Sequence, residues 1–269
     1  MSQPEAIGFQ TVACVKEPHE TEADLQARWA DAESKVRMLA PVSDLDAQVR
    51  PLSPAARVVA EEVARQPVFS TTFGAAPPEF INFRLDVLLS AQKYVDVEHA
   101  ETVQVPREED EAAVLSFCMR SNPIDPPLMG PDGGIAFSSH YSQNLVPSGL
   151  AFRTVSDHAV EVVATIISRP NFVQVARFNG RYIVANGYHR AVALIKAGHT
   201  RMPCLLRDVP SIEAAGLVPP GFFDLGRLFA PRPPLVSDFL SANATTLKLR
   251  ARNHILRVGF QVMNFEAPR

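Results

Sequence analysis

The sequence has little cysteine, no long apolar run and almost no excess charge. Its three cysteines, Cys14, Cys118 and Cys204, lie far apart without a Cys-x-x-Cys pair, which excludes a disulfide framework and a zinc knuckle. No segment approaches the roughly 18 uninterrupted apolar residues of a membrane-spanning helix. The first ten residues also lack the basic and apolar regions of a secretory signal. We therefore expect a cytoplasmic protein with reduced thiols and no membrane association.

The charge balance weakens the case for electrostatic capture of nucleic acid or anionic lipid. The 26 basic and 29 acidic side chains leave a formal net charge of -3. The length of 269 residues and the apolar fraction of 46% allow an ordinary hydrophobic core, as one large domain or as a core with appended segments. The 23 prolines indicate rigid connections rather than low-complexity sequence.

The sequence patterns predict helices near the N-terminus and mixed helices and strands after them. A helix over 21–39 carries an apolar stripe, which either packs on its own domain or contacts a partner protein. A second helix starts at Ser53 and Pro54 and stops before Pro67. The further predicted elements are a strand over 80–87, a helix after Pro106, a loop over 121–134, a helix from Thr154 to Pro170, an irregular proline-rich connector over 209–234 and a closing strand over 256–262.

Two of these elements are predicted from the spacing of apolar residues. Over 80–87 apolar and polar residues alternate, which is typical of a strand with one buried face. Over 160–167 apolar residues recur three and four positions apart, and Asp157 follows Thr154 as at a capped helix start. We therefore expect a strand in the first segment and a helix in the second.

The segment 172–206 has the most definite local pattern. Two apolar strands flank Asn179 and Gly180, the dipeptide best suited to a type I′ hairpin turn. After Gly187 a short helix, apolar on almost every side, ends at Gly198, and a third apolar strand follows. The segment therefore predicts a hairpin, a glycine turn, a buried helix and a strand in this order.

His189 and Arg190 stand in the first turn of this helix, where the helix dipole disfavours cations. No carboxylate lies nearby in the sequence to compensate them. A glycine that permits close backbone approach, the N–H groups of a helix N-terminus and two polar donors are the chemistry of an anion site, especially for phosphate. Alternatively, both side chains meet carboxylates of a distant segment and hold the helix in place. The sequence leaves both interpretations open.

The run IVANGYHRAVALIKAG, over 183–198, resembles the phosphate-binding motif of the ParB/sulfiredoxin superfamily. In that motif a strand, a Gly-x-His-Arg turn and an alanine-rich helix ending in glycine follow one another. The resemblance covers about 35 residues and extends more weakly to the helix expected upstream. It implies a small α/β domain that binds a nucleotide, with Gly187, Tyr188, His189 and Arg190 at the phosphates.

Departures from the family's motifs narrow the activities that the resemblance implies. Tyr188 occupies the position of the catalytic cysteine of sulfiredoxins, so sulfinic acid reduction is disfavoured. Neither the Glu-Asn-x-x-Arg motif nor the helix-turn-helix domain of the partition proteins follows the motif. Free-serine kinases of the superfamily use a carboxylate as base, and no pattern selects one among Glu98, Glu101, Glu108 and Asp110.

Together these observations predict an α+β (mixed α/β) protein with a ParB/sulfiredoxin-like core. The expected organisation is an N-terminal tail and helical extension over 1–75, the core over 76–208, the connector over 209–234 and a C-terminal strand extension over 235–269.

The function expected from the resemblance is the binding of a nucleoside triphosphate, CTP or ATP, with or without Mg²⁺, by a regulatory or adaptor protein whose N-terminal helices contact a protein partner. A phosphotransferase or nucleotide hydrolase on the same site is the alternative, and neither a catalytic residue nor a metal ligand is assigned. A DNA-binding protein or nuclease is a third hypothesis, suggested by the family resemblance and by the basic run from Lys248 to Arg257. A solvated strand face explains that run better, because no aromatic residues interleave with the charges.

Overall fold

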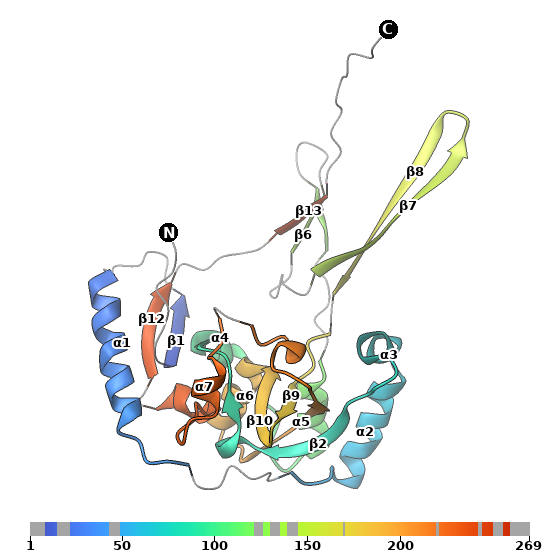
Figure 1. Ribbon diagram of the computed structural model, residues 1–269. Helices are drawn as coiled ribbons and strands as arrows, with labels where there is room; N and C mark the ends of the chain where they lie inside the picture. The colour runs from blue at the N-terminus through green and yellow to red at the C-terminus, as the bar shows by residue number, and fades with distance from the viewer. Residues whose placement is uncertain are drawn as a thin grey trace. The chain divides into compact units, whose positions relative to one another are not determined.

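The chain forms two compact units that alternate along the sequence (Figure 1). The first unit comprises residues 1–120 and 172–251, and the second comprises residues 121–171 and 252–269. The segment 121–171, which the sequence analysis placed inside the core, therefore groups with the C-terminal residues. The computed structural model describes residues 9–14, 22–42, 49–120, 126–129, 135–138, 145–168, 170–218, 221–241, 244–249 and 255–258.

The first described element of the first unit is strand β1 (Phe9–Cys14), so part of the predicted N-terminal tail is a strand of a sheet. Three helices follow it, α1 (Glu22–Arg37), α2 (Pro54–Arg65) and α3 (Pro67–Phe73). The two predicted helices are confirmed as α1 and α2. The hydroxyl of Ser53 accepts a hydrogen bond from the backbone N–H of Ala56, 3.3 Å away, so this serine is the N-cap that the sequence indicated. Pro67 ends α2 and starts α3, because proline lacks the N–H that a helix interior needs and fits its first turn.

A mixed five-stranded sheet forms the centre of the first unit, in the order β2-β11-β9-β10-β3. Its strands are β2 (Glu79–Arg84), β3 (Leu89–Ser90), β9 (Gln174–Phe178), β10 (Arg181–Asn186) and β11 (Arg201–Asp208). The pairs β11–β2 and β10–β9 are antiparallel, whereas β11–β9 and β10–β3 are parallel.

The predicted hairpin, helix and strand over 172–206 are confirmed. Asn179 and Gly180 join β9 to β10 with φ angles of 48° and 75°, the positive values that a type I′ turn requires. The helix is α6 (Tyr188–Lys196), and it is followed by Gly198 with a φ of 88°. Strand β11 then crosses the sheet with five consecutive buried residues, as expected for a strand covered on both faces.

A smaller sheet and further helices complete the first unit. The sheet has the order β12-β1-β4, with parallel pairing of β1 (Phe9–Cys14) to both β4 (Tyr94–Asp96) and β12 (Ala244–Leu249). The helices are α4 (Val97–Thr102), α5 (Glu111–Cys118) and the short α7 (Leu225–Leu228). Helix α5 packs against β11 and α2, while α4 packs against α6. The predicted helix after Pro106 is thus confirmed as α5, with Asp110 as its N-cap.

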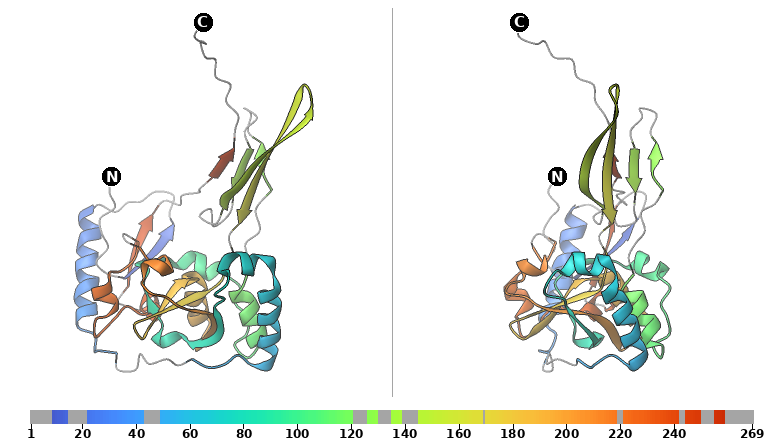
Figure 2. Two further views of the ribbon diagram at one scale, coloured as in Figure 1. Left: turned by 45° about the vertical axis from the view of Figure 1, so that its right-hand side comes forward. Right: turned by 90° about the vertical axis from the view of Figure 1, so that its right-hand side faces the viewer.

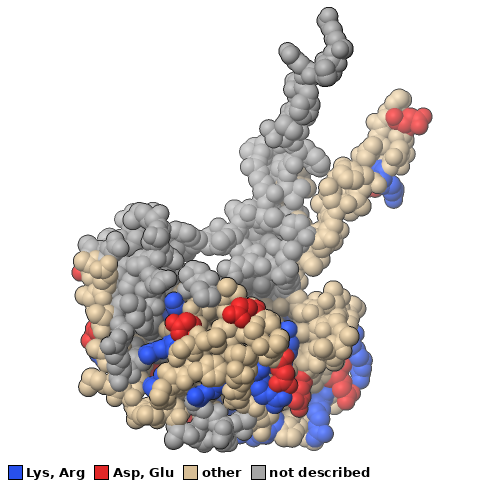
Figure 3. All heavy atoms as spheres, viewed as in Figure 1, with Lys and Arg blue, Asp and Glu red and all other residues tan. Residues whose placement is uncertain are grey.

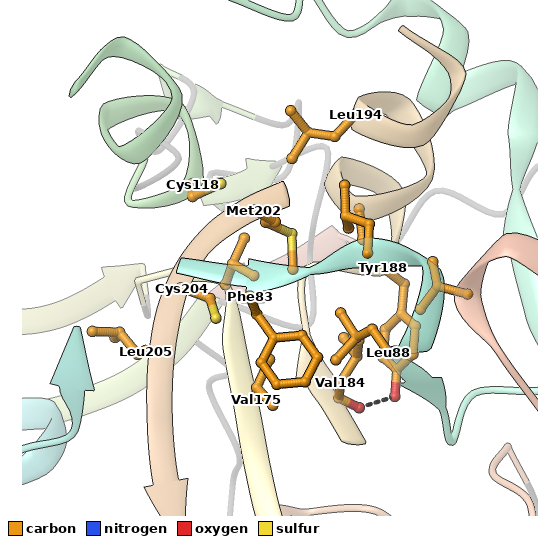
Figure 4. Close-up of a cluster of buried hydrophobic side chains, with 14 of the residues drawn as sticks. Phe83, Leu88, Cys118, Val175, Val184, Tyr188, Leu194, Met202, Cys204 and Leu205 are labelled. Carbon is orange, nitrogen blue, oxygen red and sulfur yellow. Dashed lines mark hydrogen bonds between the residues drawn. The ribbon is translucent and has the colours of Figure 1, made fainter. Parts of the chain in front are cut away.

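The core of the first unit lies between the five-stranded sheet and its helices (Figure 4). Phe83 of β2 is fully buried, and its ring centroid lies 5.0 Å from that of Tyr182 on β10. Leu194 brings α6 into the same cluster, with Met202 of β11 beside it. The prediction that the apolar helix, α6, is buried is therefore confirmed.

The predicted strand over 80–87 is shorter than expected and is covered on both faces. It ends at Arg84, and residues Leu85–Val87 form a 3-10 turn. Asn82, which the alternation assigned to solvent, is only 2% exposed, and Glu111 of α5 accepts a hydrogen bond from the Asn82 amide. Alternation along one strand does not predict that a neighbouring helix covers the polar face.

The predicted helix from Thr154 to Pro170 is wrong, because this segment is an antiparallel hairpin. Strand β7 (Leu145–Ser156) pairs with β8 (Ala159–Ser168), and Asp157 lies in the turn between them. Apolar residues are nearly continuous along β8, so they match a strand as well as a helix, and the many valines and isoleucines favour the strand. The family resemblance consequently has no support upstream of β9.

The second unit consists, in its described residues, of β strands. Besides the β7–β8 ribbon, it contains a sheet in the order β13-β6-β5, from β5 (Leu128–Met129), β6 (Ile135–Ser138) and β13 (Ile255–Val258). The predicted closing strand is observed as far as Val258, and its remainder lies outside the described residues. Figure 2 shows β7 and β8 as a long, twisted ribbon.

The α+β class predicted from the sequence is confirmed, since the first unit combines mixed sheets with packed helices. Across the described ranges, no helix has both the length and the apolar character needed to span a membrane.

Candidate functional site

The candidate site is the N-terminus of α6, and its geometry depends on Gly187. This glycine is the N-cap residue with a φ of 97°, a left-handed conformation that side chains disfavour. A Cβ atom here would lie 2.7 Å from Cγ2 of Val173, the residue before β9, so the backbone approaches Val173 more closely than a residue with a side chain allows. Its carbonyl accepts the first helical hydrogen bond, from the N–H of Ala191. Because glycine has no side chain, no side-chain hydrogen bond from the N-cap residue caps the helix.

Tyr188, the first residue of α6, belongs to the core. Its side chain is 4% exposed, and its hydroxyl donates a hydrogen bond to the carbonyl of Val184 (Figure 4). Burial raises the pKa of the phenol well above its ordinary value, so the group stays neutral. The Tyr188 side chain therefore helps to fix the turn between β10 and α6.

His189 turns from the first turn of α6 toward α4. Its Nε2 atom accepts a hydrogen bond from the backbone N–H of Asp96, 3.2 Å away. Its ring meets that of His99 edge-on, with 5.1 Å between the centroids. Since Nε2 accepts, the neutral ring carries its hydrogen on Nδ1 and can donate one hydrogen bond there.

The surroundings of His189 keep its imidazole neutral. Burial is the largest cause, followed by the charge of His99, and together with Arg190 they outweigh the opposing effect of Asp96 and lower the pKa of His189 to about 4. The side chain is therefore uncharged at neutral pH. This removes one of the two cations that conflicted with the dipole of α6.

Arg190 reaches the end of a different helix. Its side chain is 9% exposed, and Nη1 donates to the carbonyls of Cys118 and Phe117, at 2.7 and 3.3 Å. These carbonyls end α5, where the helix dipole favours a cation. The guanidinium thus links α6 to the C-terminal end of α5. Its positive charge, which is unfavourable at the N-terminus of α6, is favourable at this end of α5. The alternative interpretation of the sequence expected a distant segment to hold this side chain, and the carbonyls of α5 are among its partners.

The structure separates the roles of the four predicted residues. Gly187 shapes the turn, Tyr188 fills the core and Arg190 anchors α6 on α5. The backbone N–H groups at the start of α6 and the imidazole of His189 are the groups suited to a phosphate. Such a site offers hydrogen bonds and the positive end of the helix dipole.

Most of the carboxylates considered as a general base are engaged elsewhere. Glu101 pairs with Lys196, Glu108 accepts from the N–H and hydroxyl of Thr200, both at 2.6 Å, and Asp110 caps α5.

Asp96 is a carboxylate that acts on His189, and the sequence analysis missed it. It is the N-cap of α4, and its Oδ1 atom accepts from the N–H of His99, 2.8 Å away. The local pattern of an aspartate three residues before a histidine at a helix start was the available signal.

The described residues contain no group of three or more His, Cys, Asp or Glu side chains that could hold a metal ion. Cys118 and Cys204 are both free thiols, and burial raises the pKa of Cys118 to about 12. The basic run is split between β12, which contains Lys248, and β13, which contains Arg257, and its middle lies outside the described residues.

Comparison of the chain with protein-family models, curated proteins and solved structures finds no match in any of the three. The resemblance to the ParB/sulfiredoxin superfamily therefore depends on the residues of the motif itself. The fold and the site define the chain as an α+β protein with a glycine-capped, largely buried helix beside a neutral histidine.

Proposed function

We propose that the first unit binds the phosphates of a nucleoside triphosphate at the N-terminus of α6, as a regulatory or adaptor protein. The observation that carries the proposal is the left-handed Gly187 cap, which places backbone rather than a side chain at the start of a nine-residue helix. Helix N-termini opened by glycine are suited to phosphate because their N–H groups and dipole both favour an anion.

Each residue of the motif has a defined part in this proposal. The N–H groups of Tyr188, His189 and Arg190 bind phosphate oxygens, and Nδ1 of His189 donates a further hydrogen bond. The guanidinium of Arg190 holds α6 on α5 so that these N–H groups keep their direction. Mg²⁺, when present, is bound through the phosphates.

Binding is favoured over turnover by the state of the candidate bases. Glu101, Glu108 and Asp110 already serve an ion pair, a turn and a helix cap. The adaptor role assigns the contact with a protein partner to α1, whose described side chains are all exposed except that of Ala32.

Amide NMR tests the proposal directly, because the expected contacts are to the backbone. Titration with ATP, CTP or GTP, with and without Mg²⁺, should shift the N–H resonances of Tyr188, His189 and Arg190, and the corresponding nucleoside without phosphate should not. A ligand at about 100 times its Kd should also stabilise the protein by roughly 2.7 kcal/mol.

The matched variants are His189→Gln and His158→Gln. Glutamine at position 189 keeps an acceptor for the N–H of Asp96 but moves the second donor, so nucleotide affinity should fall several-fold. His158 lies exposed in the β7–β8 turn, and its variant should bind like the parent. The proposal is wrong if no nucleotide shifts the three amides, or if both variants bind as the parent does.

A further inference from the structure

The described part of the second unit has no hydrophobic core. Every buried apolar side chain among the described residues belongs to the first unit. On the β7–β8 ribbon, by contrast, Leu150, Phe152 and Val160 are 61%, 67% and 61% exposed. A two-stranded ribbon is only marginally stable in water, and three or more strands or a packed face are needed for stability. The exposed apolar side chains of the ribbon therefore indicate that a further strand or a packed layer covers it.

The register of the ribbon sorts its side chains onto two different faces. Residues directly opposite each other share a face, and consecutive residues alternate. One face consists of Leu150, Phe152, Thr154, Val160, Val162 and Ala164, none of them charged. The other carries Arg153 opposite Glu161, whose side chains lie 3.4 Å apart. In Figure 3 the ribbon is accordingly tan, with charged groups only toward its turn.

The two edges of the ribbon differ in how they are protected. The outer edge of β7 is interrupted by Pro147 and by two register shifts, each of which adds one unpaired residue, Ser148 and Val155. Proline and bulges are the features by which proteins prevent an edge strand from pairing further. This edge is therefore unsuited to accept another strand.

Strand β8 has none of these features. It runs from Ala159 to Ser168 without proline, lysine or an extra residue, and Glu161 is its single charge. Val163 and Ile167 on it are 45% and 41% exposed. In the described part of the chain no third strand pairs with the ribbon. A long, uninterrupted edge rich in β-branched residues is a template for another strand.

We propose that β8 pairs antiparallel with β8 of a second copy of this chain, which joins two ribbons into one four-stranded sheet. A second copy fits best because the strand is self-complementary. Pairing about a two-fold axis through Val163 places Val162 opposite Ala164 of the other copy and Val160 opposite Ile166. The uncharged faces of both ribbons then lie on the same side of the sheet.

The charges of the strand permit this pairing. With the axis at Val163, Glu161 lies opposite Thr165 of the other copy, so no like charges meet. A partner bearing many charges, such as nucleic acid, finds no complementary group on the uncharged face. The new sheet has four strands, whereas a stable sheet needs at least three and a single ribbon has two. Because one strand pair is a small interface, the dimer should be weak and concentration-dependent, with a Kd in roughly the micromolar range.

Sedimentation velocity on the full chain tests the proposal with a matched pair of variants. Val163→Lys places a cation on the β8 edge, close to its copy across the axis, whereas Ala151→Lys changes the residue directly opposite on β7. The parent should dimerise as concentration rises, the β8 variant should dimerise at least about tenfold more weakly, and the β7 variant should match the parent within about twofold. Circular dichroism establishes that both variants remain folded.

A cysteine scan keeps the proposal testable if the lysine variant does not fold. In a Cys14→Ser background, single cysteines at Val162, Val163 and Ala164 should include at least one that forms a disulfide dimer under mild oxidation. Cysteines at the β7 positions Ala151 and Phe152 should not. A parent that stays monomeric at all concentrations, or crosslinks that form through β7 alone, would overturn the proposal. If the ribbon instead binds another protein or the first unit, the parent should stay monomeric at all concentrations.

Discussion

Protonation of His189 should destabilise the first unit at mildly acidic pH. In the folded state the pKa of this histidine is lowered to about 4 from an ordinary value of 6.5, chiefly by burial and then by the charge of His99. The unfolded chain therefore binds the proton between these two values while the folded chain does not. The contribution of neutral His189 is fully present above about pH 6.5 and is lost as the pH falls toward 4.

The size of the effect follows from the two pKa values. One pKa unit corresponds to about 1.4 kcal/mol, so the whole shift is worth roughly 3 kcal/mol once the pH is below both values. Lowering the pH from about 7.5 to about 5 should remove about 2 kcal/mol of this stability. At the same time the acceptor of the Asp96 N–H is lost, because a protonated Nε2 can only donate.

Urea denaturation at both pH values, followed by circular dichroism, measures this effect. The His189→Gln variant has no proton to bind at this position, so its free energy of unfolding should fall by about 2 kcal/mol less than that of the parent. His158→Gln, which changes an exposed histidine in the ribbon turn, should follow the parent. If the parent and His189→Gln show the same pH dependence, the assignment of a partly buried, neutral imidazole is wrong.

Three further predictions concern the stability of the first unit, each measured as a free energy of unfolding in urea. Gly187→Ala should lower the free energy of unfolding by roughly 2 to 4 kcal/mol, because its Cβ would clash with Val173. Gly198→Ala has open space around the new Cβ and should cost about 1 kcal/mol. Equal losses in the two variants would contradict the packing argument. Arg190→Met should cost roughly 1 to 3 kcal/mol by leaving two carbonyls of α5 without this donor, and an unchanged stability would show that the anchor is dispensable. Asp238 pairs with Arg232 through side chains that are 5% and 15% exposed, so Asp238→Asn should cost about 3 kcal/mol. A loss below about 1 kcal/mol would show that water screens this pair.

Local sequence patterns predicted the segment around α6 because its signals are local. Asn179-Gly180 fixes a turn through the φ angles of two residues, and Gly198 ends a helix in the same way. The run of apolar residues in α6 requires burial whatever surrounds it. These features depend on residues within a few positions of one another, so one sequence is enough to predict them.

The β7–β8 segment shows where such patterns fail. The spacing of its apolar residues fits both the helical period and the strand period. The choice between helix and strand depended on the β-branched composition and on pairing between residues up to 23 positions apart. Asn82 on β2 is a similar case, since its burial depends on Glu111 of α5, which is distant in sequence. The covering of a polar face by a remote helix leaves no mark on the strand itself.

The candidate site likewise has features that the local sequence predicts and features that depend on tertiary contacts. The sequence by itself determined that Gly187 would open a short buried helix and that His189 and Arg190 would stand in its first turn, because backbone conformation and apolar spacing are properties of neighbouring residues. Only the tertiary structure decided what these side chains contact. Packing placed the end of α5 against Arg190 and the backbone of Asp96 against His189, which neutralised one expected cation and committed the other to a helix terminus. The physical reason is that charge and hydrogen bonding at a buried position depend on whichever groups the fold brings within a few ångströms.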